Sequence, residues 1–234
     1  TAPGAPRNLQ TTSKDGDDIY QCIIDLEKLQ YELAKLNALY DYMGYNTAYF
    51  GVKRKYKKAW SGISLWGSDG ELHTDFTEGD YEGELKPTKL KSVMPYTYSV
   101  IDKIYGDSPK SRVRIMRIAP KSSLVWHSHV QEHGQEETEL TIQLPIELPK
   151  GFEYSVVNKG EFRWWKRFYK PSWFKSAESF QFEEGKAYYF NSYHYHNVYN
   201  PSNEYRTTIM FYVDYTHPHI KKLVDNSFIF KNIL

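Results

Sequence analysis

The chain has a single cysteine in 234 residues, Cys22, and one cysteine cannot form an internal disulfide. An excess of either charge is also missing, since 30 Lys and Arg stand against 29 Asp and Glu for a net charge of +1. Dedicated nucleic-acid binders usually carry a basic excess, so this balance argues against that class. No apolar run approaches the ~20 residues that span a bilayer, and the first residues lack signal-peptide features. We therefore expect a cytoplasmic protein without nucleic-acid or membrane partners.

The composition that is present indicates a folded domain. Hydrophobic residues make up 40% of the chain and aromatic residues 17%, including 21 Tyr, which is enough for a sizeable core. Residues 1–17 are rich in Pro, Gly, Thr, Ser and Asp and predict a flexible arm. The remaining residues, 18–234, predict a single domain. They contain neither a glycine-rich phosphate loop nor a Gly-x-Ser-x-Gly nucleophile motif.

One amphipathic helix is expected near the N-terminus, within residues 18–43. Asp17 or Asp18 is a suitable N-cap, and Gly44 follows the expected end. The apolar face of this helix would pack on a sheet or mediate a dimer, so the sequence leaves the oligomeric state open. The apolar positions recur at steps of three and four: Cys22, Leu26, Leu29, Leu33, Leu36 and Tyr40.

Beyond this helix the pattern favours short strands. Aromatic and β-branched runs alternate with turn residues, which is typical of a sandwich, barrel or jelly roll. Asn158–Gly160 resembles a hairpin turn, and residues 50–95 look like long polar loops. Residues 162–175 interleave aromatic with basic side chains and suggest a hairpin with one wet and one packed face. The candidate strands are 98–105, 112–118, 140–146, 152–157, 161–165, 186–190 and 206–215.

The histidines gather in two short clusters. His127 and His129 are two apart, as are His194 and His196, so on strands each pair would share one face. Imidazole is the commonest ligand for borderline metals, and two such clusters in one β-rich domain favour a metal site. A polar sheet face is the alternative for any one cluster taken alone, and His133 fits a solvated loop better.

At these clusters the sequence resembles the aspartyl/asparaginyl β-hydroxylase family. The segment RIMRIAPKSSLVWHSHV is similar to the family's first iron-binding segment. GKAYYFNSYHYHNVYNPSNEYRTTIMFYVDY is similar to its second. The resemblance covers about residues 112–215. The matching positions are Pro120, Leu124 and His127, then Gly185, Phe190, Asn191, His196, Val198, Asn200, Arg206 and Asp214.

The resemblance implies a mainly β fold, a double-stranded β-helix (cupin-like jelly roll) with an N-terminal helix. It also implies an oxygenase that uses Fe(II) and 2-oxoglutarate. His127 and His196 would be the two iron ligands, and Arg206 would bind the far carboxylate of 2-oxoglutarate. A guanidinium suits that role because its planar fork stays charged and matches a carboxylate.

Three departures from the family pattern affect this hypothesis. Lys121 stands where the family has Gly after Pro. His129 stands where relatives carry Asp or Gly, so it is a candidate third metal ligand. The Arg and His that relatives place in the next strand are absent around Thr141, although Gln143 retains the ability to hydrogen-bond a carboxylate.

The function we expect is hydroxylation of a protein side chain or free amino acid, so the partner would be a small-molecule or peptide substrate. One alternative is a three-histidine cupin dioxygenase that uses no 2-oxoglutarate. Another is a jelly-roll binding module without catalysis, because a fold does not fix a function. Trp126, Tyr193 and Tyr195 are candidate pocket walls, with core packing as the alternative.

Overall fold

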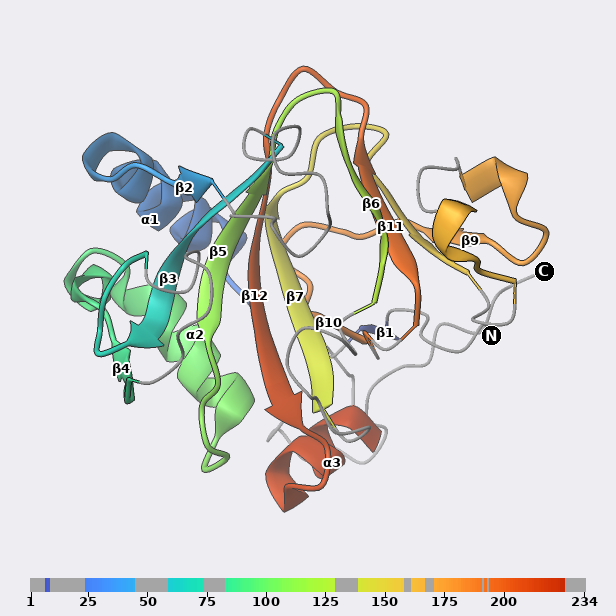
Figure 1. Cartoon of the computed structure of the whole chain (residues 1–234). Helices are drawn as coiled ribbons and strands as arrows, with labels where there is room; N and C mark the ends of the chain where they lie inside the picture. Colours follow the sequence, from blue (N-terminus) through green and yellow to red (C-terminus); the bar gives the residue numbers. More distant parts are fainter. Residues whose placement is uncertain are drawn as a thin grey trace.

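The computed structural model describes residues 7–8, 24–44, 59–73, 83–128, 139–157, 161–166, 171–190, 192 and 194–225. Two antiparallel sheets face each other, and helices cover the outer side of the larger one (Figure 1). The helices are α1 Leu26–Leu39, α2 Pro95–Tyr105 and α3 Pro218–Asp225. The larger sheet runs in the order β1 Arg7–Asn8, β10 Tyr188–Phe190, β7 Glu139–Glu147, β12 Arg206–Asp214, β5 Val113–Ile118, β3 Trp60–Ser68 and β2 Met43–Gly44, with β4 Leu85–Pro87 paired to β3. The smaller sheet runs β6 Ser122–His127, β11 His196–Asn200, β8 Glu153–Val156 and β9 Glu178–Phe180.

The eight strands from β5 to β12 cross between the sheets in the order of a double-stranded β-helix. Strands β5, β7, β10 and β12 lie side by side in the larger sheet, and β6, β8, β9 and β11 form the smaller one. The β5–β6 and β11–β12 links pass between the sheets at one end, the top of Figure 1. This topology confirms the predicted mainly β, cupin-like fold.

Strand alternation divides the larger sheet into two faces. On β7, Ile142 and Leu144 point outward into a core that includes Leu29 and Leu33 of α1. The other face looks toward the smaller sheet. Its buried apolar side chains form a second core, and we call the space around that core the barrel interior. The members of this second core are Trp60, Met116, Ile118, Leu124, Phe152, Tyr154, Val156, Phe182, Tyr188, Phe190, Val198 and Met210.

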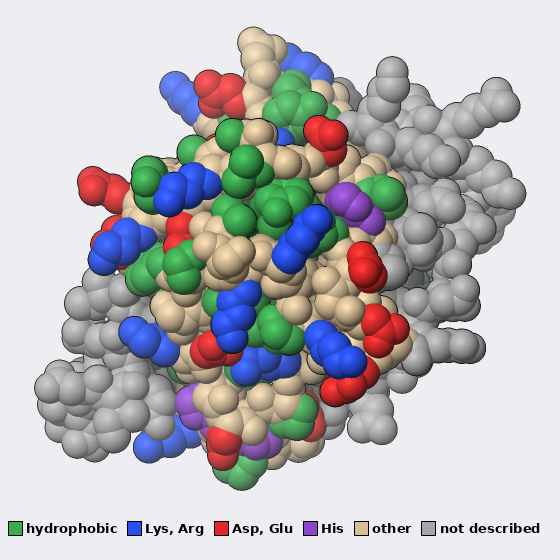
Figure 2. All heavy atoms as spheres, turned by 90° about the vertical axis from the view of Figure 1, so that its left-hand side faces the viewer, with side chains coloured by type: hydrophobic (Ala, Val, Ile, Leu, Met, Phe, Trp, Pro, Cys, Tyr) green, Lys and Arg blue, Asp and Glu red, His purple; other side chains and the backbone are tan. Residues whose placement is uncertain are grey.

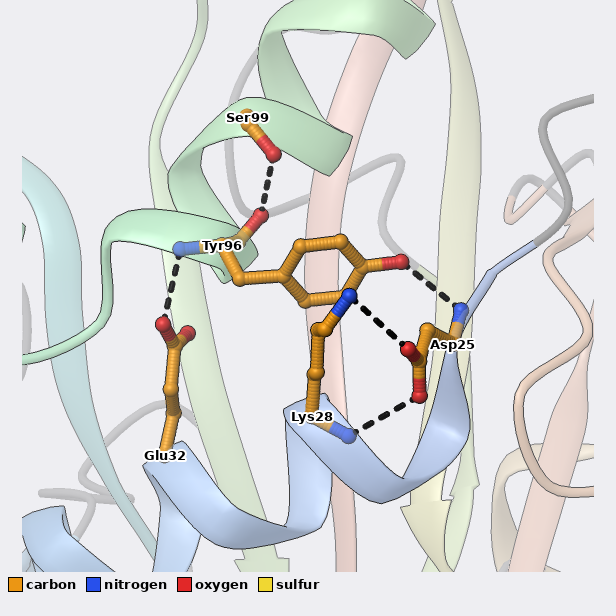
Figure 3. Close-up of polar contacts among 5 residues, drawn as sticks. All are labelled: Asp25, Lys28, Glu32, Tyr96 and Ser99. Atoms are coloured by element: carbon orange, nitrogen blue, oxygen red, sulfur yellow. Dashed lines mark hydrogen bonds and ion pairs between the residues drawn. The ribbon is translucent and has the colours of Figure 1, made fainter.

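Helix α1 confirms the predicted N-terminal helix but begins later than expected. Its N-cap is Asp25, whose carboxylate accepts a hydrogen bond from the backbone N–H of Lys28 at 3.1 Å, rather than Asp17 or Asp18. The helix is fixed to α2 by buried polar contacts (Figure 3). Glu32 accepts from the backbone N–H groups of Tyr96 at 2.7 Å and Thr97 at 2.8 Å, so it caps the start of α2.

The prediction of a strand at residues 98–105 was wrong, because this segment is helix α2. Pro95 occupies its first turn, and Gly106 ends it with a φ of +57°. Tyr98, Ile101 and Tyr105 are buried at helical spacing. The β-branched and aromatic composition suggested a strand, but the same residues also recur at the helical period, and the segment folds as a helix.

Two further predictions were wrong. Residues 50–95 were expected to be loops, yet Trp60–Ser68 is a nine-residue strand of the larger sheet. Its small Gly and Ser residues hid the strand, because eight of its nine positions are buried and it shows no wet and dry alternation. Residues 161–165 form no strand, and 3-10 turns occupy Trp164–Lys166 and Pro171–Trp173 in place of the expected hairpin. The predicted turn at Asn158–Gly160 lies outside the described residues.

The surface over α1 and α2 carries both signs of charge. Figure 2 shows Lys and Arg side chains interspersed with Asp and Glu, so neither sign dominates the described part of this face. Of the described helices, none is both long and apolar enough to cross a bilayer.

Candidate functional site

The two predicted iron ligands face each other across a pair of strands. His127 is the last residue of β6, His196 is the first residue of β11, and the two are direct partners in the antiparallel ladder. Their ring centroids lie 4.3 Å apart, and both side chains are buried. Sequence positions 69 residues apart are thus brought into contact at the end of the smaller sheet that lies at the bottom of Figure 1.

Hydrogen bonds fix the tautomer that each ring adopts when it is neutral. His127 Nδ1 lies 2.7 Å from the carbonyl oxygen of Val125, and His196 Nδ1 lies 2.9 Å from that of His194. A carbonyl oxygen only accepts, so Nδ1 is the donor and the lone pair of each neutral ring is on Nε2. Burial, and then the neighbouring His127, hold the pKa of His196 well below its ordinary value. Neutral rings oriented by a carbonyl are the form in which histidine binds metals.

The third predicted ligand, His129, lies outside the described residues. Within the described part of the chain, no group of three or more His, Cys, Asp or Glu side chains is placed to hold a metal. His194 is half-buried and contributes its backbone carbonyl to orient His196. The structure therefore assembles two of the three candidate ligands.

Arg206, the predicted ligand of the far carboxylate, is buried inside the barrel. It begins β12, is 2% exposed, and its Nη2 donates to Gln143 Oε1 at 2.5 Å. Its guanidinium also lies 4.8 Å from the ring centre of Phe152, and its Nε is buried with no hydrogen-bond partner in the described structure. Burial lowers the pKa of Arg206 to about 9. A buried cation with an unused donor is arranged for an anion.

Gln143 contacts Arg206. The carbonyl oxygen of Gln143 accepts from the arginine, and the predicted hydrogen bond to a cosubstrate carboxylate would come from its side-chain NH2 group. Gln143 therefore orients Arg206, because a guanidinium held by a fixed acceptor loses little freedom when a ligand binds.

Tyr154 links the histidine pair to Arg206, and sequence analysis missed it. Its ring stacks on His196 at 5.6 Å and 17°, and its hydroxyl is buried without a hydrogen-bond partner in the described structure. Burial raises the pKa of Tyr154 well above its ordinary value, and the charge of Arg206 opposes that rise. The one available signal was strand alternation in residues 152–157, which places Tyr154 on the inner face once the face of the strand is known.

The expected aromatic pocket walls lie elsewhere. Trp126 points away from His127, as strand alternation requires, and packs on Phe174 at 5.0 Å. Tyr195 stacks on Phe162 at 3.7 Å, so both aromatic side chains belong to a separate cluster on the outer side of the smaller sheet. Tyr193 lies outside the described residues. The inner wall is built instead by Phe190, whose ring lies 5.9 Å from that of His196.

A turn with positive φ at Lys121 lies at the end of the barrel where the β5–β6 and β11–β12 links run. Lys121, where the family has Gly, adopts a φ of +54°. The backbone N–H of Lys121 donates to Ser202 at 3.1 Å, and its Nζ donates to the Pro201 carbonyl. The side-chain amide of Asn200 donates to the carbonyl of Ile118 at 3.2 Å. These bonds join the β5–β6 and β11–β12 links, and so they fix the position along the barrel at which β12 begins with Arg206.

Comparisons with known proteins find distant structural matches. No family model matches the chain, and no curated protein does. Solved structures with a similar fold include a 2OG-Fe(II) oxygenase family oxidoreductase from Burkholderia pseudomallei, 12% identical over 83% of this chain and 80% of that one, with a TM-score of 0.49. Another is the non-heme alpha ketoglutarate dependent carbocyclase SnoK from nogalamycin biosynthesis. It is 12% identical over 90% of this chain and 87% of that one, with a TM-score of 0.49.

A third is HygX from Streptomyces hygroscopicus, solved with nickel and 2-oxoglutarate bound, which is 9% identical over 83% of this chain and 81% of that one, with a TM-score of 0.48. None of the three is described as an aspartyl/asparaginyl β-hydroxylase. With TM-scores below 0.5 they carry no argument, and the activity has to be argued from the residues themselves.

Proposed function

We propose that this chain is an oxygenase dependent on Fe(II) and 2-oxoglutarate. The observation that carries the proposal is a pair of buried, unused polar groups in the barrel interior. Arg206 Nε and Tyr154 Oη have no partner in the described structure, and the ring of Tyr154 stacks on His196. A structural arginine would satisfy its donors within the protein, whereas a carboxylate would satisfy both of these groups at once.

The donor set fits the metal. Two imidazoles with Nδ1 held by backbone carbonyls present Nε2, as non-haem iron sites require. His129 is the third ligand in this proposal. When bound, iron and 2-oxoglutarate supply the oxidising chemistry that hydroxylates an unactivated carbon. The protein's own part is to bind and orient the cosubstrate and substrate and to exclude water. The rings of Tyr154 and Phe190 form an apolar wall beside His196.

Arg206 supplies the charge that a dicarboxylate needs. The far carboxylate of 2-oxoglutarate would accept hydrogen bonds from the Arg206 guanidinium and from the Tyr154 hydroxyl, while Gln143 holds the arginine in place. The unfavourable burial of the cation, visible in its lowered pKa, is relieved when an anion arrives. In line with the resemblance to aspartyl/asparaginyl β-hydroxylases, the proposed substrate is a protein side chain or a free amino acid.

Oxygen uptake tests this proposal. With Fe(II) present, adding 2-oxoglutarate should stimulate oxygen consumption and release succinate in equal amount, and His196→Ala should abolish both. The matched control is His219→Ala, because His219 contacts the Ile104 carbonyl outside the barrel and should leave the rate unchanged. Oxygen consumption that ignores 2-oxoglutarate would instead favour the three-histidine dioxygenase. No Fe(II) binding at all would leave the non-catalytic binding module.

A further inference from the structure

A second possible binding place is a cavity of about 490 Å³ beside the larger sheet, at the end of the barrel away from the two histidines. The β5–β6 and β11–β12 links run at this end, the top of Figure 1. Cavities of this size are typical of sites for small molecules. The residues that line it are Arg117, Glu147, Leu148, Pro149, Glu184, Glu204 and Tyr205.

Arg117 supplies the one positive charge of this lining. Its neighbour Ile118 packs in the inner core, so strand alternation turns Arg117 to the outer face of the sheet. Its guanidinium lies between two rings, 4.5 Å from the centre of Tyr42 and 4.4 Å from that of Tyr205. Its side chain forms no hydrogen bond or ion pair with another described residue, and its Nε is buried. Two aromatic faces therefore hold the cation in place while its donors stay unused.

Three carboxylates stand on the other walls. Glu147 Oε2 accepts from Thr207 Oγ1 at 2.5 Å, and Glu184 Oε1 accepts from the backbone N–H of Leu148 at 2.6 Å. Each of these two carboxylates is oriented through one oxygen, which leaves the other for a ligand. Within the described structure, Glu204 forms its hydrogen bonds through its backbone N–H and carbonyl, so its carboxylate is also unused.

Strand pairing keeps the opposite charges of this cavity apart. Thr207 pairs with Arg117 on one side and with Glu147 on the other, so the two charged residues are two strand spacings apart, or about 10 Å. Among the described residues, no ion pair joins Arg117 to any of the three carboxylates. The lining carries one positive and three negative charges, a net charge of −2 at neutral pH. A ligand that complements it has a carboxylate at one end and more than one cationic group.

We propose that this cavity binds a free amino acid with a basic side chain. Its α-carboxylate lies on the guanidinium of Arg117, whose planar fork matches a carboxylate, and its two ammonium groups donate to the glutamates. A bare metal ion does not fit, because no group of three or more His, Cys, Asp or Glu side chains in the described part of the chain is placed to hold one. 2-Oxoglutarate has two carboxylates and no amine, so this lining repels it, and the site is independent of the proposed oxygenase function.

Calorimetric titration of the full chain with L-lysine and two analogues tests the site. L-Lysine should bind wild-type protein at least tenfold more tightly than L-lysinamide, which lacks the carboxylate, or L-norleucine, which lacks the side-chain amine. Arg117→Gln should bind L-lysine no better than L-lysinamide, and Glu204→Gln should weaken L-lysine but not L-norleucine. The control is Lys110→Gln, because Lys110 also lies beside two rings, those of Trp66 and Tyr105, but outside the cavity. It should bind L-lysine like the wild type.

Three results would overturn the site: no saturable binding of L-lysine by wild-type protein, equal affinity for L-lysine and L-lysinamide, or a difference between them that survives in Arg117→Gln. If Arg117→Gln does not fold, the three ligands on wild-type protein decide, together with Arg117→Lys. That variant keeps the charge and loses the fork, and it should bind L-lysine at least tenfold more weakly. None of these titrations needs Fe(II) or 2-oxoglutarate, so their failure and the failure of the proposed function are separate outcomes.

Discussion

Replacing Arg206 by Met should make the ligand-free protein more stable while abolishing its response to 2-oxoglutarate. The pKa of Arg206 falls to about 9 because the side chain is buried, and this corresponds to about 5 kcal/mol against the charged form. The sign follows from proton binding. Between about pH 9 and its ordinary value the unfolded chain keeps a proton that the folded chain has lost, so stability rises with pH there and the penalty is full at neutral pH.

Two losses offset that gain in the Met variant. Gln143 Oε1 is left buried without its donor, which costs about 1–3 kcal/mol, and the contact with the ring of Phe152 is worth up to ~2 kcal/mol. The net expectation is a stabilisation of about 2 kcal/mol, in the range measured when buried charges are replaced by apolar residues. For a domain of this size the melting temperature should rise by about 4–8 °C.

Thermal melts with and without Fe(II) and 2-oxoglutarate measure both effects under anaerobic conditions. Wild-type protein should gain about 2.7 kcal/mol when 2-oxoglutarate is present at 100 times its dissociation constant, and the Arg206→Met variant should gain nothing from it. Arg117→Met is the control and should respond to 2-oxoglutarate like the wild type. A lower melting temperature for ligand-free Arg206→Met would refute the argument, because it would mean that the arginine serves the fold rather than a ligand.

Three further outcomes follow from particular contacts. Tyr154→Phe should keep the melting temperature within about 2 °C and weaken 2-oxoglutarate binding roughly tenfold, because its hydroxyl has no partner in the described protein; unchanged affinity would exclude Tyr154 from the site. Glu32→Ala should destabilise the protein by about 3 kcal/mol in denaturant titrations, since it uncaps α2, and a cost below ~1 kcal/mol would contradict this. Hydrogen bonds from Ser176 and Lys175 lower the pKa of Glu161 to about 2, so its contribution is full above the ordinary carboxyl pKa and lost as pH falls through about 2. Amide exchange at Ser176 should speed up over that range in wild-type protein but show no such change in Glu161→Gln.

The parts of the fold that sequence could predict are those whose pattern has one structural solution. The apolar residues of α1 recur at a spacing that fits only a helix, and the strands that carry Arg206 and Gln143 have a pattern that fits only a strand. Segment 98–105 failed because β-branched and aromatic side chains fit a buried helix as well as a strand. Segment 60–68 failed because a strand buried on both faces has no alternation to detect.

The candidate site divides in the same way. His127, His196 and Arg206 were accessible because they fall in spaced motifs. Tyr154 was not, because its place in the site depends on which face of its strand looks inward, and that is set by pairing with distant segments. The neighbours of a predicted residue cannot be read from the sequence either, which is why the contact between Gln143 and Arg206 was not expected.

The most direct test of the central claim is anaerobic titration of the protein with Fe(II) and then with 2-oxoglutarate, following the visible charge-transfer band of the chelate. We predict a band in wild-type protein, loss of iron binding in His127→Ala and His196→Ala, and loss of the band with iron retained in Arg206→Met. Iron bound with no band in wild-type protein would contradict the use of 2-oxoglutarate, and a band unaffected by either histidine substitution would contradict the metal site itself.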